Sequence, residues 1–86
     1  MNEEEVEDGV RECFSSVFSL TEAQEISRFS QEREANWDSV AHVTLVAAIG
    51  ERFGFEIDFE EAMSVDSFRS AVALVHAELS RRAEQD

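Results

Sequence analysis

The sequence predicts an all-α fold: a bundle of three main helices and one short helix, with a long loop between the first and second helices. The 86 residues are enough for a single domain, spanning residues 1–86, with one small core. The chain contains no proline and only three glycines. Turns depend on these two residue types, so a turn-rich all-β domain is disfavoured. Apolar residues recur at spacings of three and four in several segments, which is the period of a helix.

The first helix is expected over residues 3–18. Its acidic start opposes the positive end of the helix dipole. Cys13 is the only cysteine, so no internal disulfide can form, and its place on the apolar face predicts a buried, unreactive thiol. That face is formed by Val6, Val10, Cys13, Phe14 and Val17.

A long polar connection is expected over residues 19–37. The simplest reason for such a loop in a small domain is that it joins two helices whose ends lie far apart. Ile26 and Phe29 are expected to anchor the loop to the bundle. Trp37 carries a large apolar ring and is expected to pack at the base of the second helix.

The second helix is expected over residues 39–53, with Asp38 or Ser39 as its N-cap and Gly54 at its C-terminal end. On a helical wheel, its apolar residues cover two neighbouring arcs instead of one. The first arc is expected to face the core, with His42 as a packed and hydrogen-bonded histidine. Its apolar members are Leu45, Val46, Ile49 and Phe53.

The second arc of this helix contains Val40, Val43, Ala47 and Gly50. In a small bundle, a helix with two apolar faces is expected to present one of them to solvent or to a partner. The alternative is that the helix is buried on all sides. Polar residues cover its remaining side, which argues against complete burial.

Two further helices are expected over residues 59–64 and 67–81. Asp58 and Glu61 match the capping-box pattern at the start of the shorter one. The longer one has an apolar stripe formed by Phe68, Val72, Val75 and Leu79.

The charge of the chain is strongly acidic, with 20 Asp and Glu residues against 7 Lys and Arg, for a net charge of −13. Phosphate backbones and anionic membranes repel such a surface, so neither nucleic acid nor membrane is an expected partner. Partners with basic surfaces are favoured, although the acids could also serve only to keep the protein in solution. The acidic N-terminus and the lack of a long apolar run predict a cytoplasmic protein, expected as a monomer.

Sequence patterns of enzymes and metal sites are absent. His42 and His76 lie on different predicted helices, and neither has a second ligand at metal-binding spacing. There is no glycine-rich phosphate loop, and a bundle of this size has little room for a closed pocket. We therefore expect no catalytic residues and no metal site.

Three features of residues 37–62 occur together. The run Trp37-Asp38-Ser39-Val40 opens the second helix, Phe53-Gly54 ends it, and Asp58-Phe59-Glu60-Glu61-Ala62 forms an acidic third helix. This combination resembles the acyl carrier protein family, whose hallmark is Asp-Ser and an apolar residue at that helix start. The Trp-Asp-Ser start looks more like discrete carriers of specialised pathways, such as polyketide, nonribosomal peptide or unusual acyl assembly, than like housekeeping fatty-acid carriers.

The resemblance implies a covalent cofactor. Ser39 would be esterified with 4′-phosphopantetheine from coenzyme A by a magnesium-dependent phosphopantetheinyl transferase, and the arm would carry an acyl or related group as a thioester. Asp38 would cap the helix and be recognised by the transferase. Acyl-loading and acyl-processing enzymes with basic surfaces would be the further partners. The expected partner-binding residues are Val40, Val43, Ala47, Glu51, Glu60 and Glu61.

Two alternatives remain open for the function. The chain could be a carrier-like helical module that binds proteins and is never modified. It could also be an acidic helical adaptor unrelated to carriers. Only the carrier hypothesis requires modification of Ser39.

Overall fold

The computed structural model describes residues 2–19, 26, 28–32, 34 and 37–85, with side chains as far as residue 82. Within this part of the chain there are four helices: α1 (Glu3–Phe18), α3 (Ser39–Phe53), α4 (Phe59–Met63) and α5 (Phe68–Gln85). The predicted all-α bundle is confirmed. The first two predicted helices match, whereas α5 continues to Gln85 instead of ending at residue 81, and α4 ends at Met63 instead of residue 64.

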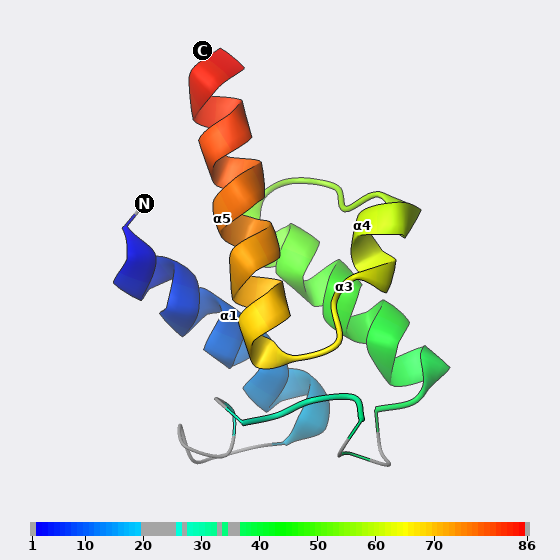
Figure 1. The fold of residues 1–86 in the computed structure, drawn as a ribbon. Coiled ribbons are helices and arrows are strands. Elements are labelled where there is room, and N and C mark those ends of the chain that lie inside the picture. Colours follow the sequence, from blue (N-terminus) through cyan, green and yellow to red (C-terminus); the bar gives the residue numbers. More distant parts are fainter. Residues whose placement is uncertain (1, 20–25, 27, 33, 35–36, 86) are drawn as a thin grey trace.

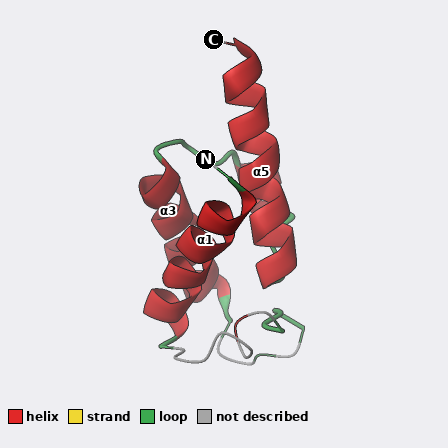
Figure 2. Ribbon diagram, turned by 90° about the vertical axis from the view of Figure 1, so that its left-hand side faces the viewer, coloured by secondary structure: helices red, strands yellow, loops and turns green. Residues whose placement is uncertain are grey.

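The helix α1 links the two other long helices, since it packs against both α3 and α5. Figure 1 shows the short α4 next to α3, between the connection that comes from α3 and the one that leads on to α5. Figure 2 shows that α5 extends beyond the other helices toward its C-terminal end. The molecule measures 40 × 26 × 18 Å along its principal axes.

Phe14 of α1 lies at the centre of the core and is fully buried. The rings of Phe29, Trp37 and Phe68 meet it edge-on, with their centroids 6.0, 5.5 and 5.7 Å from its own. Edge-to-face pairs of this kind are favoured by the ring quadrupoles. One residue of α1 thus holds together the loop, the base of α3 and the start of α5.

The long loop is anchored where its apolar residues enter the core. Ile26, Phe29 and Trp37 are only 3%, 4% and 3% exposed, so the predicted anchors are confirmed. Backbone hydrogen bonds add to this attachment: the amide of Phe68 donates to the carbonyl of Phe29 at 3.0 Å, and the amide of Gln31 donates to a carbonyl before α5 at 2.8 Å. The loop therefore brings Trp37 to a defined position at the start of α3.

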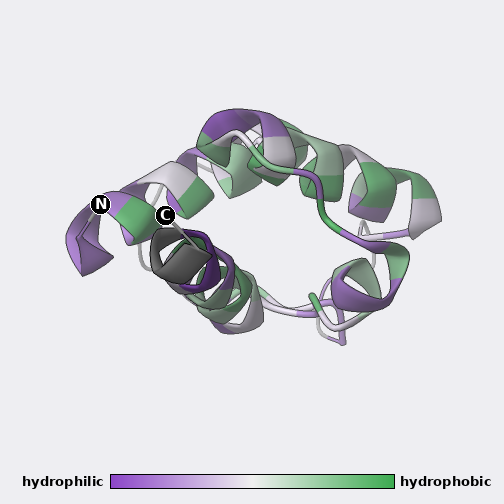
Figure 3. Ribbon diagram, turned by 90° about the horizontal axis from the view of Figure 1, so that it is seen from above, coloured by the Kyte–Doolittle hydropathy of each residue, from purple (hydrophilic) through white to green (hydrophobic). Residues whose placement is uncertain are grey.

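The two apolar faces predicted for α3 are present. Leu45 and Ile49 are fully buried, while Val40 and Val43 are 76% and 68% exposed. In Figure 3, hydrophobic residues follow much of the length of α3. The prediction that Val46 belongs to the core arc is wrong, because this side chain is half-buried at the surface, at the border between the two arcs.

The short helix α4 adds no buried residue to the core. Asp58 stands at its N-cap, but its side chain makes no capping hydrogen bond, so the predicted capping box is wrong. The carboxylate of Glu61, the other half of that pattern, instead pairs with Arg81 of α5 at 3.5 Å. Burial of neighbouring residues and contacts with α3 and α5 therefore hold this helix in place.

Candidate functional site

The start of α3 presents Ser39 to solvent. Asp38 is the N-cap, and its Oδ1 accepts a hydrogen bond from the backbone amide of Ala41 at 2.9 Å. This decides between the two N-cap residues that the sequence allowed. Ser39 is the first residue of the helix, is exposed, and makes no side-chain hydrogen bond to any residue that the structure describes. Its hydroxyl is therefore accessible, and no described residue engages it.

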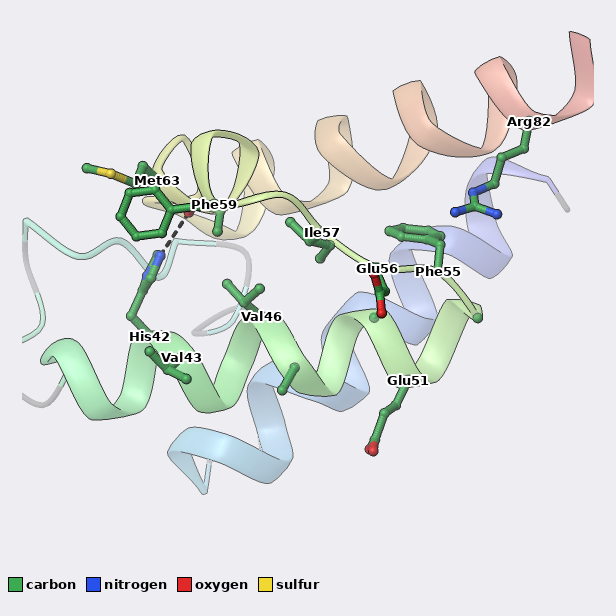
Figure 4. A pocket seen from close by; sticks show the side chains of 14 residues that line it. His42, Val43, Val46, Glu51, Phe55, Glu56, Ile57, Phe59, Met63 and Arg82 are labelled. Atoms are coloured by element: carbon green, nitrogen blue, oxygen red, sulfur yellow. Dashed lines mark hydrogen bonds between the residues drawn. The ribbon is translucent and has the colours of Figure 1, made fainter. Parts of the chain in front are cut away.

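An open apolar groove of about 950 Å³ runs along α3 from the turn after Ser39. Figure 4 shows α3 forming one side of it, with α4 and the segment before α4 on the other side. Its apolar lining includes Val43, Val46, Ala47, Ile57, Phe59 and Met63. The second apolar arc of α3 thus faces a groove, and the prediction that it is exposed is confirmed.

The opposite wall of the groove contains apolar residues that the sequence analysis did not single out. Phe59 and Met63 of α4 are 79% and 67% exposed. They are four residues apart, so they lie on the same face of a helix. That spacing is the signal that could have found them.

His42 stands at the end of the groove nearest Ser39 and is packed and hydrogen-bonded, as predicted. Trp37 Nε1 lies 3.1 Å from His42 Nδ1, and His42 Nε2 lies 2.8 Å from the carbonyl oxygen of Ala62. The rings of His42 and Trp37 are stacked, with centroids 6.1 Å apart. The dashed line in Figure 4 marks the bond from His42 to α4.

The other end of the groove is polar, and Arg82 of α5 is the residue there that the sequence analysis missed. Its guanidinium lies over the ring of Phe55, 5.3 Å from the centroid, as Figure 4 shows. Its Nε also donates to the buried carboxylate of Glu78 at 3.3 Å. Glu51 and Glu56 line the groove at the same end.

The predicted partner-binding residues fall into three groups. Val43, Ala47 and Glu51 line the groove, while Val40 and Glu60 are exposed beside it. Glu61 is half-buried, since Arg81 holds its carboxylate. All six lie on α3 or α4: Val40, Val43, Ala47 and Glu51 on α3, and Glu60 and Glu61 on α4.

The buried thiol of Cys13 lies in the core, away from this groove, as predicted. Burial raises its pKa from 9.0 to about 11, although the positive charge of Arg52 lowers it and Glu12 raises it slightly further. A thiol that stays protonated at neutral pH is a poor nucleophile. It is a structural residue.

We expect the alkaline stability of the protein to report this thiol. The unfolded chain ionises Cys13 near pH 9 and the folded chain only near pH 11, so the free energy of unfolding falls as pH rises through this interval. The seven basic residues are all arginine and there is no tyrosine, so no other side chain titrates there. Urea unfolding at both ends of this pH range checks it. The decline should be smaller in Cys13→Ala, and an equal decline in both proteins contradicts the assignment.

Comparisons with known proteins add no family. No protein-family model and no curated protein sequence matches this chain. In the part of the chain that the structure describes, no three His, Cys, Asp or Glu side chains are grouped so that they could hold a metal ion. No described helix is both long and apolar enough to cross a membrane. The exposed serine and the adjoining groove remain as the features from which a function can be argued.

Proposed function

We propose that this chain is an acyl carrier protein, which holds its cargo as a thioester on a 4′-phosphopantetheine arm attached to Ser39. The single observation that carries the proposal is the position of Ser39: an exposed hydroxyl at the first residue of α3, one helical turn before His42 and Val43, where an open apolar groove begins. An alternative attachment residue would need the same accessibility, which the core residues lack.

The chemistry of attachment fits this position. The Ser39 hydroxyl oxygen would displace the adenosine bisphosphate part of coenzyme A at the pyrophosphate, losing its proton and forming a phosphodiester. That phosphodiester would keep one negative charge at the N-terminus of α3, where the helix dipole favours an anion. Because Asp38 caps the helix, modification of Ser39 would not remove a bond that α3 needs. The flexible arm could then bring its thioester to several enzymes in turn.

The surface around Ser39 supports partners of two chemistries. Val40, Val43 and Ala47 offer an exposed apolar strip to a transferase or an acyl-processing enzyme. Glu51 and Glu60 add exposed negative charge, which would attract basic surfaces and lose its effect as salt increases, because the screening length is about 8 Å at physiological ionic strength. A monomeric, cytoplasmic carrier of a specialised biosynthetic pathway is the setting that we propose.

The test measures the intact mass of the protein after incubation with coenzyme A, magnesium and a broad-specificity phosphopantetheinyl transferase. The wild type should gain one phosphopantetheinyl group, and Ser39→Ala should gain none while keeping its melting temperature. Ser80→Ala, at an exposed serine of α5, is the matched control and should be modified like the wild type. Modification of Ser39→Ala would rule out this site.

If the wild type stays unmodified, the chain is better explained as a carrier-like module that binds other proteins. The observation that favours this second function is the exposed apolar surface formed by four side chains, three that line the groove and one, Val40, that precedes it on α3. These are Val40, Val43, Phe59 and Met63.

We expect Val43→Asp to leave the free energy of unfolding within about 0.5 kcal/mol of the wild type, since this side chain is 68% exposed. The same variant should slow modification by the transferase or acyl transfer, because it places a charge on the apolar strip. Thr44→Asp adds that charge to the neighbouring exposed position outside the groove and should change neither quantity. Equal slowing by both variants would attribute the effect to charge alone, and a large stability loss in Val43→Asp would assign Val43 to the core.

A further inference from the structure

The ring of His42 joins two segments of the chain that are far apart in sequence. The indole N–H of Trp37 can only donate, so His42 Nδ1 accepts this hydrogen bond at 3.1 Å. In the neutral ring the hydrogen is then on Nε2, which donates to the carbonyl oxygen of Ala62 at 2.8 Å. One neutral tautomer therefore satisfies both contacts, with one ring nitrogen for each segment.

The contact at Ala62 matters because α4 has few other attachments. No residue of α4 is buried, and its N-cap lacks a side-chain hydrogen bond. The ion pair between Arg81 and Glu61 spans 3.5 Å, with 55% and 27% of the two side chains exposed. Exposed pairs of this kind contribute little. The His42 bond is the shorter and less exposed of these two side-chain links from α4 to the long helices.

The helix α4 is also a wall of the groove, since Phe59, Ala62 and Met63 line it. Figure 4 shows His42 reaching across from α3 to this wall. A bond that fixes Ala62 relative to α3 fixes the distance between the two walls. The second bond of the same ring holds Trp37, whose side chain is 3% exposed. Trp37 stands two residues before Ser39.

We infer that His42 is a positioning residue: its Nε2 holds the α4 wall of the groove, and its Nδ1 holds Trp37 beside the start of α3. The inference deepens the proposed function, because the groove that His42 shapes adjoins the proposed attachment residue Ser39. Its physical content does not depend on the arm, since both hydrogen bonds belong to the unmodified chain.

The two bonds can be separated by substitution. Asparagine can place an acceptor near the position of Nδ1, and glutamine can place a donor near the position of Nε2. His42→Asn therefore keeps the bond to Trp37, His42→Gln keeps the bond to Ala62, and His42→Phe keeps the stacked ring but neither bond. The control position is His76, the other histidine, which lies on α5 and does not line this groove.

Two measurements on the unmodified protein follow the two bonds independently. The first is hydrogen exchange of the Trp37 indole N–H by NMR, which is unambiguous because the chain has one tryptophan. Exchange should be slow in the wild type and His42→Asn, and about fivefold faster in His42→Gln and His42→Phe, the equivalent of one net hydrogen bond. The second is hydrogen exchange of the backbone amides of α4, the helix that the bond to Ala62 holds. These amides should keep their wild-type exchange rates in His42→Gln and exchange about fivefold faster in His42→Asn and His42→Phe.

This crossed pattern distinguishes positioning from a general structural role. The matched variants His76→Asn, His76→Gln and His76→Phe should leave both readouts at their wild-type values. If all three His42 variants change both readouts together, in proportion to their loss of stability, the inference is wrong. It is also wrong if His42→Phe behaves like the wild type. Because no measurement uses the arm, an unmodified Ser39 would overturn the proposed function without affecting this result.

Discussion

Replacing Phe14 by alanine is expected to lower the free energy of unfolding by about 3–5 kcal/mol. Phe14 is fully buried, and its ring contacts those of Phe29, Trp37 and Phe68 at the centre of the core. Those three rings come from the loop and α5, which cannot collapse into the space left behind without losing their own contacts. The total stability of a native protein is roughly 5–15 kcal/mol, so this single substitution would remove a large fraction of it.

Urea unfolding followed by far-UV circular dichroism measures this loss. The matched control is Phe59→Ala, which removes the same ring from a side chain that is 79% exposed. It should change the free energy of unfolding by less than about 0.5 kcal/mol. Similar losses in the two variants would mean that Phe14 is not at the centre of the core.

Replacing Gly50 by alanine is expected to destabilise the protein by up to about 2 kcal/mol. A Cβ atom at this position would lie 2.7 Å from the backbone oxygen of Phe55. The backbone there is held in place, because the amides of Gly54 and Phe55 both donate to the carbonyl of Gly50, at 2.8 and 3.1 Å. Overpacking costs about 1–3 kcal/mol, and the better helix propensity of alanine returns only about 1 kcal/mol.

Gly9→Ala provides the comparison for Gly50→Ala. A Cβ atom at Gly9 would also be too close to its neighbour, 2.6 Å from Cζ of Phe53, but this is the far end of a half-buried side chain, which can move. The loss should therefore be smaller at Gly9 than at Gly50, as measured by thermal and urea unfolding. The opposite order would mean that the connection after α3 yields more easily than the Phe53 ring does.

Most of the helices could be predicted because their signals are local. The spacing of Val6, Val10 and Cys13 defines one face of α1 without any knowledge of its neighbours. The same holds for the two apolar arcs of α3, and its N-cap could be narrowed to Asp38 or Ser39. The anchoring of the loop by Phe29 and Trp37 was also predictable, since large apolar rings in a polar segment have little reason to remain exposed.

Residues that depend on contacts between elements could not be predicted in this way. Phe59 and Met63 form the second wall of the groove only because α4 lies opposite α3. Glu78 is buried, at 6% exposure, because Arg81 and Arg82 of the next turn supply its hydrogen bonds. A pattern of apolar and charged residues says which face of a helix is apolar, but not which other helix will meet it.

The sequence alone determined that this protein is a small all-α bundle and that Ser39 stands at the start of its second long helix. It also showed that this helix has a second apolar arc in addition to the one that faces the core. It also supplied the family resemblance from which the carrier proposal starts. Only the tertiary structure decided that this second apolar arc borders a groove and that His42 reaches across the groove to Ala62. The physical reason is that helical periodicity is encoded within a few residues of chain, whereas a groove needs two walls, and their separation is set by packing and hydrogen bonds between elements distant in sequence.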